Sequence, residues 1–422
     1  MRFLTILPFS LYNKRKDHKR MIRMQIQNDY NHTIYASYLG YITQAIVNNF
    51  APLLFLTFSR DYSLSLEKIA LITTLNFLVQ LSVDLASAGV IDKIGYRIPV
   101  LTAHVFSAGG LVALAVLPKI LPDPYIAILI AVVLYAIGGG LIEVLISPIV
   151  EACPTEKKEA AMSLLHSFYC WGHLGVILLS TLFFTLFGIS NWPILACLWA
   201  LVPAANVIYF SLVPLFPITG EHEPLSLRSL LKEKAFWILM VLMICAGASE
   251  HSMSQWASAF AESGLNLSKT VGDLAGPSLF ALLMGTARAL YGKYSERIKL
   301  DLAMRTSALL CLVSFAMASF LRSPLFGLLG CACCGFAVGI FWPGTFSLAA
   351  IKLPAAGASM YALLALGGDI GCSLGPTSVG FVAGHFNGDL HAGFVLAMLF
   401  PALILILTGM LGRHSEAGRT DQ

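Results

Sequence analysis

The feature that most constrains this chain is a succession of twelve long apolar stretches separated by short polar segments. An α-helix rises about 1.5 Å per residue, so about 20 residues cross the hydrocarbon core of a bilayer, which is roughly 30 Å thick. Within lipid the backbone must satisfy its own hydrogen bonds, and a helix does so inside one segment. We therefore predict an all-α polytopic membrane protein with twelve transmembrane helices.

The predicted helices fall into two groups of six and are numbered 1 to 12 along the chain. Helices 1 to 6 are expected at residues 37–58, 67–91, 98–118, 124–150, 160–188 and 192–214. Helices 7 to 12 are expected at residues 235–261, 271–292, 302–321, 324–349, 356–384 and 391–412. The chain is then divided into an N-terminal tail (1–36), a first six-helix bundle (37–215), a polar linker (216–234), a second six-helix bundle (235–412) and a C-terminal tail (413–422).

The composition excludes several functional classes. Hydrophobic residues make up 57% and charged residues 12% of the chain, against roughly 25% charged residues in an ordinary soluble domain. A soluble enzyme is therefore excluded, and a formal charge of +4 is too small to indicate nucleic-acid binding. The sequence contains no phosphate-binding Gly-rich loop, no His-Glu-x-x-His and no paired metal cysteines. The nine cysteines are interpreted as small hydrophobic residues, and we expect no enzyme activity, no cofactor and no metal site.

The distribution of Lys and Arg predicts the orientation, because translocated loops are poor in these residues. With the N-terminus inside, the segments on the cytoplasmic side contain 20 of the 27 Lys and Arg residues and the outer loops contain five. Both termini and the linker are thus predicted to be cytoplasmic. The short loops and the absence of organellar signals favour a bacterial inner membrane, and we expect a monomer.

The two halves of the sequence resemble each other. Gly172-x-x-Gly175 in helix 5 recurs as Gly368-x-x-Gly371 in helix 11, 196 residues later. Pro148 in helix 4 has a counterpart, within one residue of the same offset, at Pro343 in helix 10. Two features in register across a charged linker indicate a pair of six-helix pseudo-repeats.

A motif rich in Gly and charge lies between helices 2 and 3. Its residues are Asp84, Gly89, Asp92, Lys93, Gly95 and Arg97. A degenerate copy near the loop between helices 8 and 9 comprises Arg288, Gly292, Glu296 and Arg297. The pattern resembles the signature of the major facilitator superfamily, and the resemblance implies that family's fold. These residues are predicted to act in gating, because their charges can pair across the two halves or with helix ends in one conformation only.

A second resemblance rests on helices 4 and 5. Glu143-Val-Leu-Ile-Ser147-Pro148, followed by Leu165-His-Ser-Phe-Tyr-Cys-Trp-Gly172, is similar to the fucose and glucose/galactose proton symporters of that superfamily. The resemblance implies that Glu143 takes part in proton-coupled sugar transport, and Tyr169 stands where the family has Asn.

The sequence departs from that family in helix 1. The family has an acid there, whereas the matching stretch of this chain offers Gln44, Asn48 and Asn49 as polar residues. Proton coupling is therefore expected to rest on Glu143, alone or with His166.

Glu143 and His166 are predicted to lie at the same depth, about seven and six residues from the inner ends of helices 4 and 5. An acid inside a bundle helix is costly and is by default a functional candidate. A carboxylate beside an imidazole can carry a proton at physiological pH, so we predict that this pair performs proton coupling. The alternative is a structural contact that locks helix 4 to helix 5.

Helix 7 contributes a second polar stretch, with Glu250, His251, Gln255 and Trp256. A sugar site combines an aromatic ring, on which the CH face of the sugar stacks, with carboxylate and amide groups that bond its hydroxyls. The predicted substrate-binding residues are therefore Gln44, Asn48, Asn49, Tyr169, Glu250, His251, Gln255, Trp256 and Trp342. The alternative for helix 7 is a polar seam against helix 11 or an extracellular gate.

Helices 10 and 11 carry further candidates. Pro343 interrupts the hydrogen-bond ladder of helix 10 and is predicted to kink it as a gating element, while Trp342 either swings in this gate or faces lipid. Asp369 in helix 11 is expected to pair with Glu250 or with a cation of an inner loop. His104 and His173 are interpreted as satisfied core residues.

The resemblance and the polar residues together predict a secondary transporter that works by alternating access. We expect proton-coupled uptake of a neutral sugar or a similar small polar solute, with the solute, protons and the bilayer as partners. One alternative is a proton-antiport exporter of drugs or metabolites. Another is a transporter-like sensor without turnover, although a linker of about 18 residues is too short to fold alone.

Overall fold

The chain is helical throughout the part that the computed structural model describes, which comprises residues 29–87, 91–155, 158–216, 230–294, 299–353 and 357–417. Among these residues there are helices and connecting turns and no strand. Within these described ranges, ten helical segments are long and apolar enough to cross a membrane. The other two predicted spans correspond to α14 and α18, which carry Arg288 and Asp369. The predicted all-α membrane fold is confirmed.

The N-terminal bundle contains the first six spans. Span 1 consists of α2 (Tyr30–Asn49), the short η1 (Ala51–Leu54) and α3 (Phe55–Tyr62). Spans 2 to 6 are α4 (Leu66–Ser87), α6 (Arg97–Ile120), α7 (Pro124–Glu151), α8 (Lys158–Phe187) and α9 (Trp192–Leu212), with α5 (Ile91–Ile94) and η2 (Ile189–Asn191) as connecting turns. Span 1 begins earlier than the predicted residue 37, because Asp29 caps the helix by accepting the backbone N–H of Asn31.

The C-terminal bundle contains the other six spans. Span 7 is α11 (Lys234–Ser254), continued by α12 (Ala257–Ala259) and η3 (Phe260–Gly264), and span 8 is α13 (Lys269–Ala275) with α14 (Pro277–Tyr294). Spans 9 to 12 are α15 (Leu300–Phe320), α16 (Pro324–Val338) with α17 (Phe341–Lys352), α18 (Gly357–His385), and α19 (Leu390–Ala397) with α20 (Leu399–Ala417).

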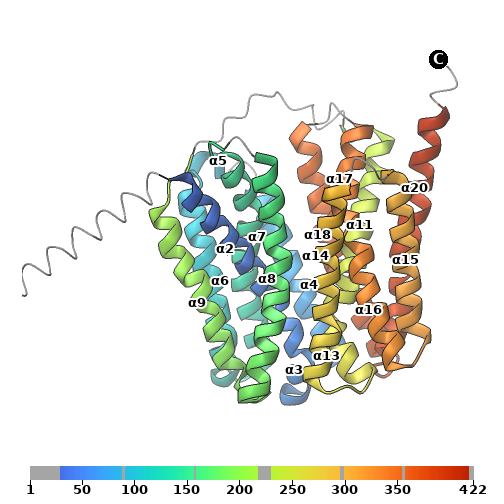
Figure 1. The fold of residues 1–422 in the computed structure, drawn as a ribbon. Coiled ribbons are helices and arrows are strands. Elements are labelled where there is room, and N and C mark those ends of the chain that lie inside the picture. The colour runs from blue at the N-terminus through green and yellow to red at the C-terminus, as the bar shows by residue number, and fades with distance from the viewer. Residues whose placement is uncertain are drawn as a thin grey trace, which may run out of the picture.

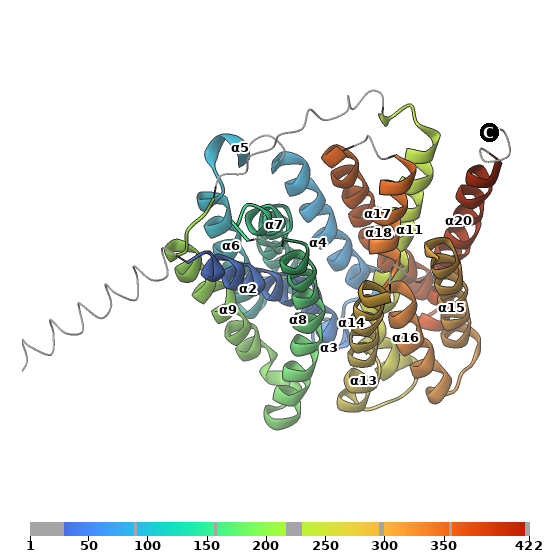
Figure 2. The same cartoon turned by 45° about the horizontal axis from the view of Figure 1, so that its top comes forward.

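The two bundles repeat the same packing arrangement (Figures 1 and 2). In the first half span 1 (α2) packs on span 5 (α8), and span 3 (α6) packs on span 4 (α7) and span 6 (α9). In the second half span 7 (α11) packs on span 11 (α18), and span 9 (α15) packs on span 10 (α16) and span 12 (α20). The equivalent pairs confirm the predicted pseudo-repeats. The first span of each half is also interrupted, after Asn49 and after Ser254.

The bundles meet along two lines of contact. At one, α4 packs on α18, and at the other, α8 packs on both α13 and α14. We call the end at which α9 finishes and α11 begins the linker end, which also carries α5 and is uppermost in Figure 1. The opposite end carries α3 and α13.

Glycines allow the closest of the helix contacts. A Cβ on Gly371 of α18 would collide with the carbonyl oxygen of Ile244 in α11, and a Cβ on Gly247 would collide with the carbonyl oxygen of Gly368. In the first half Gly172 of α8 approaches α2, where its Cβ would lie 3.0 Å from that of Ala45. The predicted Gly-x-x-Gly echo thus marks the same helix pair in both halves, although a Cβ on Gly175 would meet nothing within 4 Å.

We predict that Gly371→Ala destabilises the protein by about 1–3 kcal/mol, because the added methyl group must push α18 away from α11. Gly175→Ala is the matched control, since its methyl group enters open space and alanine favours the helix. Thermal unfolding in detergent, followed by size-exclusion chromatography, compares the two. An equal melting temperature for both variants would contradict this packing.

Candidate functional site

A chain of amide side chains runs through the N-terminal bundle and ends on Glu143. Nε2 of Gln44 donates both to Oε2 of Glu143, at 3.1 Å, and to Oε1 of Gln80, at 3.0 Å. Gln80 in turn donates to Oδ1 of Asn48 at 2.8 Å, and Asn76 donates to the same oxygen at 3.1 Å. Three helices, α2, α4 and α7, are joined by these contacts. Buried polar groups in a membrane bundle require such partners.

The amide chain continues into the C-terminal bundle through helix 7. Gln255, which is 2% exposed, donates from Nε2 to the backbone oxygen of Asn48 at 3.1 Å. Its neighbour Trp256 is fully buried, donates from Nε1 to the carbonyl of Pro376 at 2.9 Å and packs against Phe55. In this conformation protein encloses the Trp256 ring, where the sequence predicted a ring that stacks on a solute.

A buried ion pair lies at the centre of the interface between the bundles. Arg288 of α14 reaches Oε2 of Glu250 in α11 at 3.2 Å, and its other terminal nitrogen lies 3.2 Å from Sγ of Cys170 in α8. The exposed fractions of the two charged side chains are 25% and 6%. The sequence placed Arg288 in a gating motif near the loop between helices 8 and 9. The structure places Arg288 inside α14, where an unpaired guanidinium would be costly and Glu250 is its partner, and its role in gating stays a prediction.

Several polar atoms around this ion pair lack a partner in the described part of the chain. Nε of Arg288 and Nδ1 of His173 are buried without a hydrogen bond, and His173 is only 3% exposed. Tyr169 lies between the ion pair and the amide chain, where its hydroxyl accepts from Asn49 at 3.5 Å. His251 packs edge-on against the ring of Phe77, with ring centroids 4.8 Å apart. Unsatisfied buried groups mark a place where a ligand or water completes the structure.

Glu143 and His166 do not form the predicted pair. Glu143 is bonded to Gln44, whereas the His166 ring stacks at an angle on Tyr41, with centroids 5.4 Å apart. Among the described residues no hydrogen bond or ion pair joins Glu143 to His166. The two residues were expected at a common depth, but depth does not determine which faces of α7 and α8 point toward each other. Tyr41 itself bonds to Ser147 at 2.8 Å.

Asp369 has a partner that the sequence did not predict. Its carboxyl group lies within hydrogen-bonding range of that of Asp84 in α4, rather than beside Glu250 or a cation whose side chain the structure describes. Trp342 packs directly on the adjacent Gly368, where a Cβ would collide with the indole ring. Helix 10 is interrupted at Gly339 and Ile340, four and three residues before Pro343, so Trp342 lies at the start of α17.

The predicted gating motif is only partly described. Arg97 donates to the backbone oxygens of Phe210, Ser211 and Val213, at 2.9, 3.3 and 2.9 Å, and so caps the end of α9. Gly95 adopts a φ of 76°, a conformation that glycine reaches without strain. The remaining motif positions lie outside the described residues or side chains, and they are Gly89, Asp92, Lys93, Gly292, Glu296 and Arg297.

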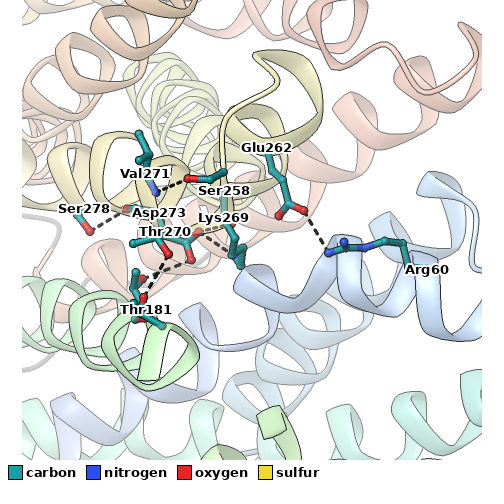
Figure 3. A network of polar contacts seen from close by, with 11 residues as sticks. Arg60, Thr181, Ser258, Glu262, Lys269, Thr270, Val271, Asp273 and Ser278 are labelled. Carbon is teal, nitrogen blue, oxygen red and sulfur yellow. Dashed lines mark hydrogen bonds and ion pairs between the residues drawn. The ribbon is translucent and has the colours of Figure 1, made fainter. Parts of the chain in front are cut away.

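A polar network closes the interface at the end opposite the linker (Figure 3). Asp273, which is fully buried, accepts from Lys269 at 2.8 Å, from Ser258 at 2.5 Å and, across the interface, from Thr181 of α8 at 3.3 Å. Nearby, Thr185 contacts Thr270 at 3.1 Å. A more exposed ion pair joins Arg60 to Glu262 at 3.1 Å.

Four residues of the site were not predicted as site residues from the sequence. Asn76 and Gln80 stand one helical turn apart in an otherwise apolar segment, and that spacing was the available signal for a polar face. Cys170 and His173 flank the predicted Trp-Gly pair of helix 5, one turn apart, but a lone cysteine and a lone histidine resemble core residues. Only the fold shows that both lie at the Arg288–Glu250 pair.

Known proteins support this architecture. The family model described as Major Facilitator Superfamily matches residues 37–376 of the chain. A search of curated proteins finds no significant match.

Solved transporter structures resemble the chain over nearly its whole length. A mutant form of the nucleoside transporter NupG is 14% identical, with a TM-score of 0.73 over 90% of this chain and 99% of NupG. A bacterial homologue of the human lysosomal transporter Spinster is 13% identical, with a TM-score of 0.69 over 91% of this chain and 97% of the homologue. The fucose:proton symporter FucP of E. coli is 15% identical, with a TM-score of 0.62 over 90% of this chain and 98% of FucP. At these identities the likeness establishes a shared fold.

We predict that Asp273→Asn destabilises the protein by about 3 kcal/mol or more, because the variant leaves the Lys269 ammonium without its carboxylate partner. Arg60→Gln is the matched control at the same end. Its side chain is 61% exposed, and exposed pairs contribute less than about 1 kcal/mol. Thermal unfolding in detergent distinguishes the two, and equal losses in stability would show that burial of the Asp273 network is unimportant.

Proposed function

The chain belongs to the Major Facilitator Superfamily and is a multi-pass secondary transporter, and we propose that it performs proton-coupled uptake of a neutral sugar or a similar small polyhydroxylated solute. The linker end would face the cytoplasm of a bacterial cell, as the Lys and Arg distribution indicates. The protein would act as a monomer in the inner membrane.

The Arg288–Glu250 ion pair is the observation that carries the solute class. A hydroxyl group both donates and accepts hydrogen bonds. One of two adjacent hydroxyls can therefore donate to Glu250 while the other accepts from the unpaired Nε of Arg288. The guanidinium and the carboxylate neutralise each other. A neutral solute leaves that balance intact, whereas a charged solute would bring an uncompensated charge into a buried site.

The surroundings of the ion pair fit a polar solute of small size. Nδ1 of His173 offers one further buried hydrogen-bonding atom, and Tyr169 contributes its ring and hydroxyl. Both bundles supply residues, since α8 carries Tyr169 and His173 while α11 and α14 carry Glu250 and Arg288. A solute bound here would contact both halves, as alternating access requires.

Glu143 is the proposed proton carrier. Its hydrogen bond comes from an amide, and no ion pair to a cation is found for it among the described residues. A proton can therefore join or leave Glu143 without breaking a buried ion pair. Oε1 of Gln44 is buried without a donor, so the same amide can accept from a protonated Glu143 after rotation or donate to an ionised one.

The amide chain connects the proposed proton and solute sites. It leads from Glu143 through Gln44 and Gln80 to Asn48, whose backbone oxygen accepts from Gln255 one turn beyond the Glu250 region of helix 7. A change of protonation at Glu143 can alter these hydrogen bonds in turn. Coupling between the two sites then has a contiguous physical route.

We predict that Arg288→Gln weakens solute binding at least about tenfold, because one lost charge-assisted hydrogen bond corresponds to roughly 1.4 kcal/mol or more. Isothermal titration with fucose, galactose, glucose and a nucleoside provides the measurement. Arg305→Gln removes a half-exposed arginine that pairs with Asp301 and should leave affinity unchanged. Unaltered affinity in Arg288→Gln would place the solute elsewhere.

We predict that Glu143→Gln abolishes solute-driven proton entry but retains solute exchange. Liposomes that contain a pH-sensitive dye report acidification, and counterflow of labelled solute reports exchange. Uptake by the wild type should fall as external pH rises, because the proton is a co-substrate, and this dependence should be absent in the variant. Normal acidification by Glu143→Gln would refute the assignment, and alkalinisation by the wild type would indicate antiport.

A further inference from the structure

The contact between α4 and α18 ends on two carboxylic acids, one from each bundle. The helices run antiparallel, so residues near the opposite end meet first, as Glu67 with Gly384 and Ala70 with Gly380. A hydrogen bond between Thr74 and Thr377 follows. Asp84 and Asp369 continue this register and meet about one turn from the linker end of α4.

Neither carboxyl group has a donor from the described side chains. Asp369 is 6% exposed, and Oδ1 of Asp84 is buried without a hydrogen bond. The titratable groups that face the pair are Glu143 from α7 and Cys372, one turn further along α18. No lysine, arginine or histidine side chain that the structure describes faces either acid. The indole of Trp342 covers Gly368 beside them.

Two carboxylates at hydrogen-bonding distance, with a third acid nearby and no cation among the described side chains, cannot all remain ionised at low cost. A carboxylate only accepts hydrogen bonds, so two ionised groups in contact have no hydrogen to share and repel each other. One proton between them converts that repulsion into a short, charge-assisted O–H···O hydrogen bond. The contact between the half-buried Asp84 and the buried Asp369 therefore favours a proton between them.

We propose that Asp84 and Asp369 share one proton and form a second proton site, separate from Glu143, that holds α4 and α18 together at the linker end of their contact. Loss of the proton leaves two anions on opposite bundles and favours separation of the linker ends. Gain of the proton restores the contact. The protein then binds a proton on the interface itself, and the occupancy of this site shifts the balance between the two conformations.

The shared proton would regulate the proposed transport cycle. Only this biological role rests on the proposed function. Glu143 lies within one bundle and serves solute coupling. The Asp84–Asp369 pair lies between bundles and responds to the pH on the linker side even when no solute is bound. The two proton sites can therefore be separated by experiment.

The test measures the distance between the bundles at the linker end as a function of pH. Ile98 at the start of α6 and Ile351 at the end of α17 are each 65% exposed and accept spin labels after replacement by cysteine. Cys197 is exposed and Cys333 half-buried, so both are replaced by serine, while the other cysteines are buried. Double electron–electron resonance in lipid nanodiscs, without solute, reports the distance distribution between about pH 5.5 and 8.5.

We expect the ratio of the long-distance to the short-distance population to rise with pH, by at most about tenfold per pH unit for one linked proton. Asp84→Asn and Asp369→Asn should each remove this dependence and hold the short distance at high pH, because the amide donates to the remaining carboxylate at any pH. Glu143→Gln should retain a pH dependence, moved to lower pH because a negative charge that faces the pair is removed, even though it loses solute-driven proton entry.

Three outcomes would overturn the inference. The first is a wild-type distance distribution that does not change with pH. The second is a pH dependence that survives in both aspartate variants or disappears in Glu143→Gln, which would assign the proton to Glu143. The third is a distribution that responds to the replacement of potassium by sodium at constant pH, which would make a metal cation the occupant. None of these readings depends on solute transport, so a failure of the proposed function is recognised separately.

Discussion

The structure depends on one constraint, which is that polar groups inside a hydrocarbon layer must find their partners within the protein. The polar side chains of this chain satisfy it by gathering in and beside the interface between two apolar bundles. Gln44, Gln80 and Asn48 bond one another, while Arg288 reaches Glu250. The lipid-facing surfaces keep large exposed residues such as Leu201 and Ile208. The same constraint that orders the fold thus concentrates its chemistry at the surface where the halves move.

The buried acids fall into two kinds, and their partners explain the difference. Glu250 and Asp273 each pair with a cation, Arg288 and Lys269, so protonation of either acid would leave a buried positive charge unpaired. Glu143 and Asp369 have no cation partner among the described residues. Proton exchange at these positions breaks no ion pair. The first kind of acid therefore suits binding and support, and the second kind suits proton uptake and release.

Much of the fold could be predicted from the sequence, because apolar length and the Gly-x-x-Gly echo report local and repeated properties. The candidate site was predicted less completely. The helix 1 amides were identified from the resemblance, Glu143 also from the cost of an acid in a membrane, and Glu250 from the residue types that a sugar site needs, but their partners were not identified. Spacing along one helix gives depth and face, whereas partners depend on how neighbouring helices rotate. This is why His166 was paired with Glu143, and why Arg288 was assigned to a loop motif although it lies beside Glu250.

The placement of strong and weak contacts bears on how the halves can move. The buried ion pairs Lys269–Asp273 and Glu250–Arg288 each join residues of the C-terminal bundle, and the Arg97 cap lies within the N-terminal bundle. The described contacts that cross the interface are mostly single hydrogen bonds or exposed pairs, such as Gln255 to Asn48, Thr181 to Asp273 and Arg60 to Glu262. A neutral hydrogen bond or an exposed ion pair contributes roughly 1 kcal/mol, and a hydrogen bond to a charged group about 1.5–3 kcal/mol. Rocking the bundles therefore breaks contacts of at most a few kcal/mol each, at a cost that one bound solute or one proton can offset.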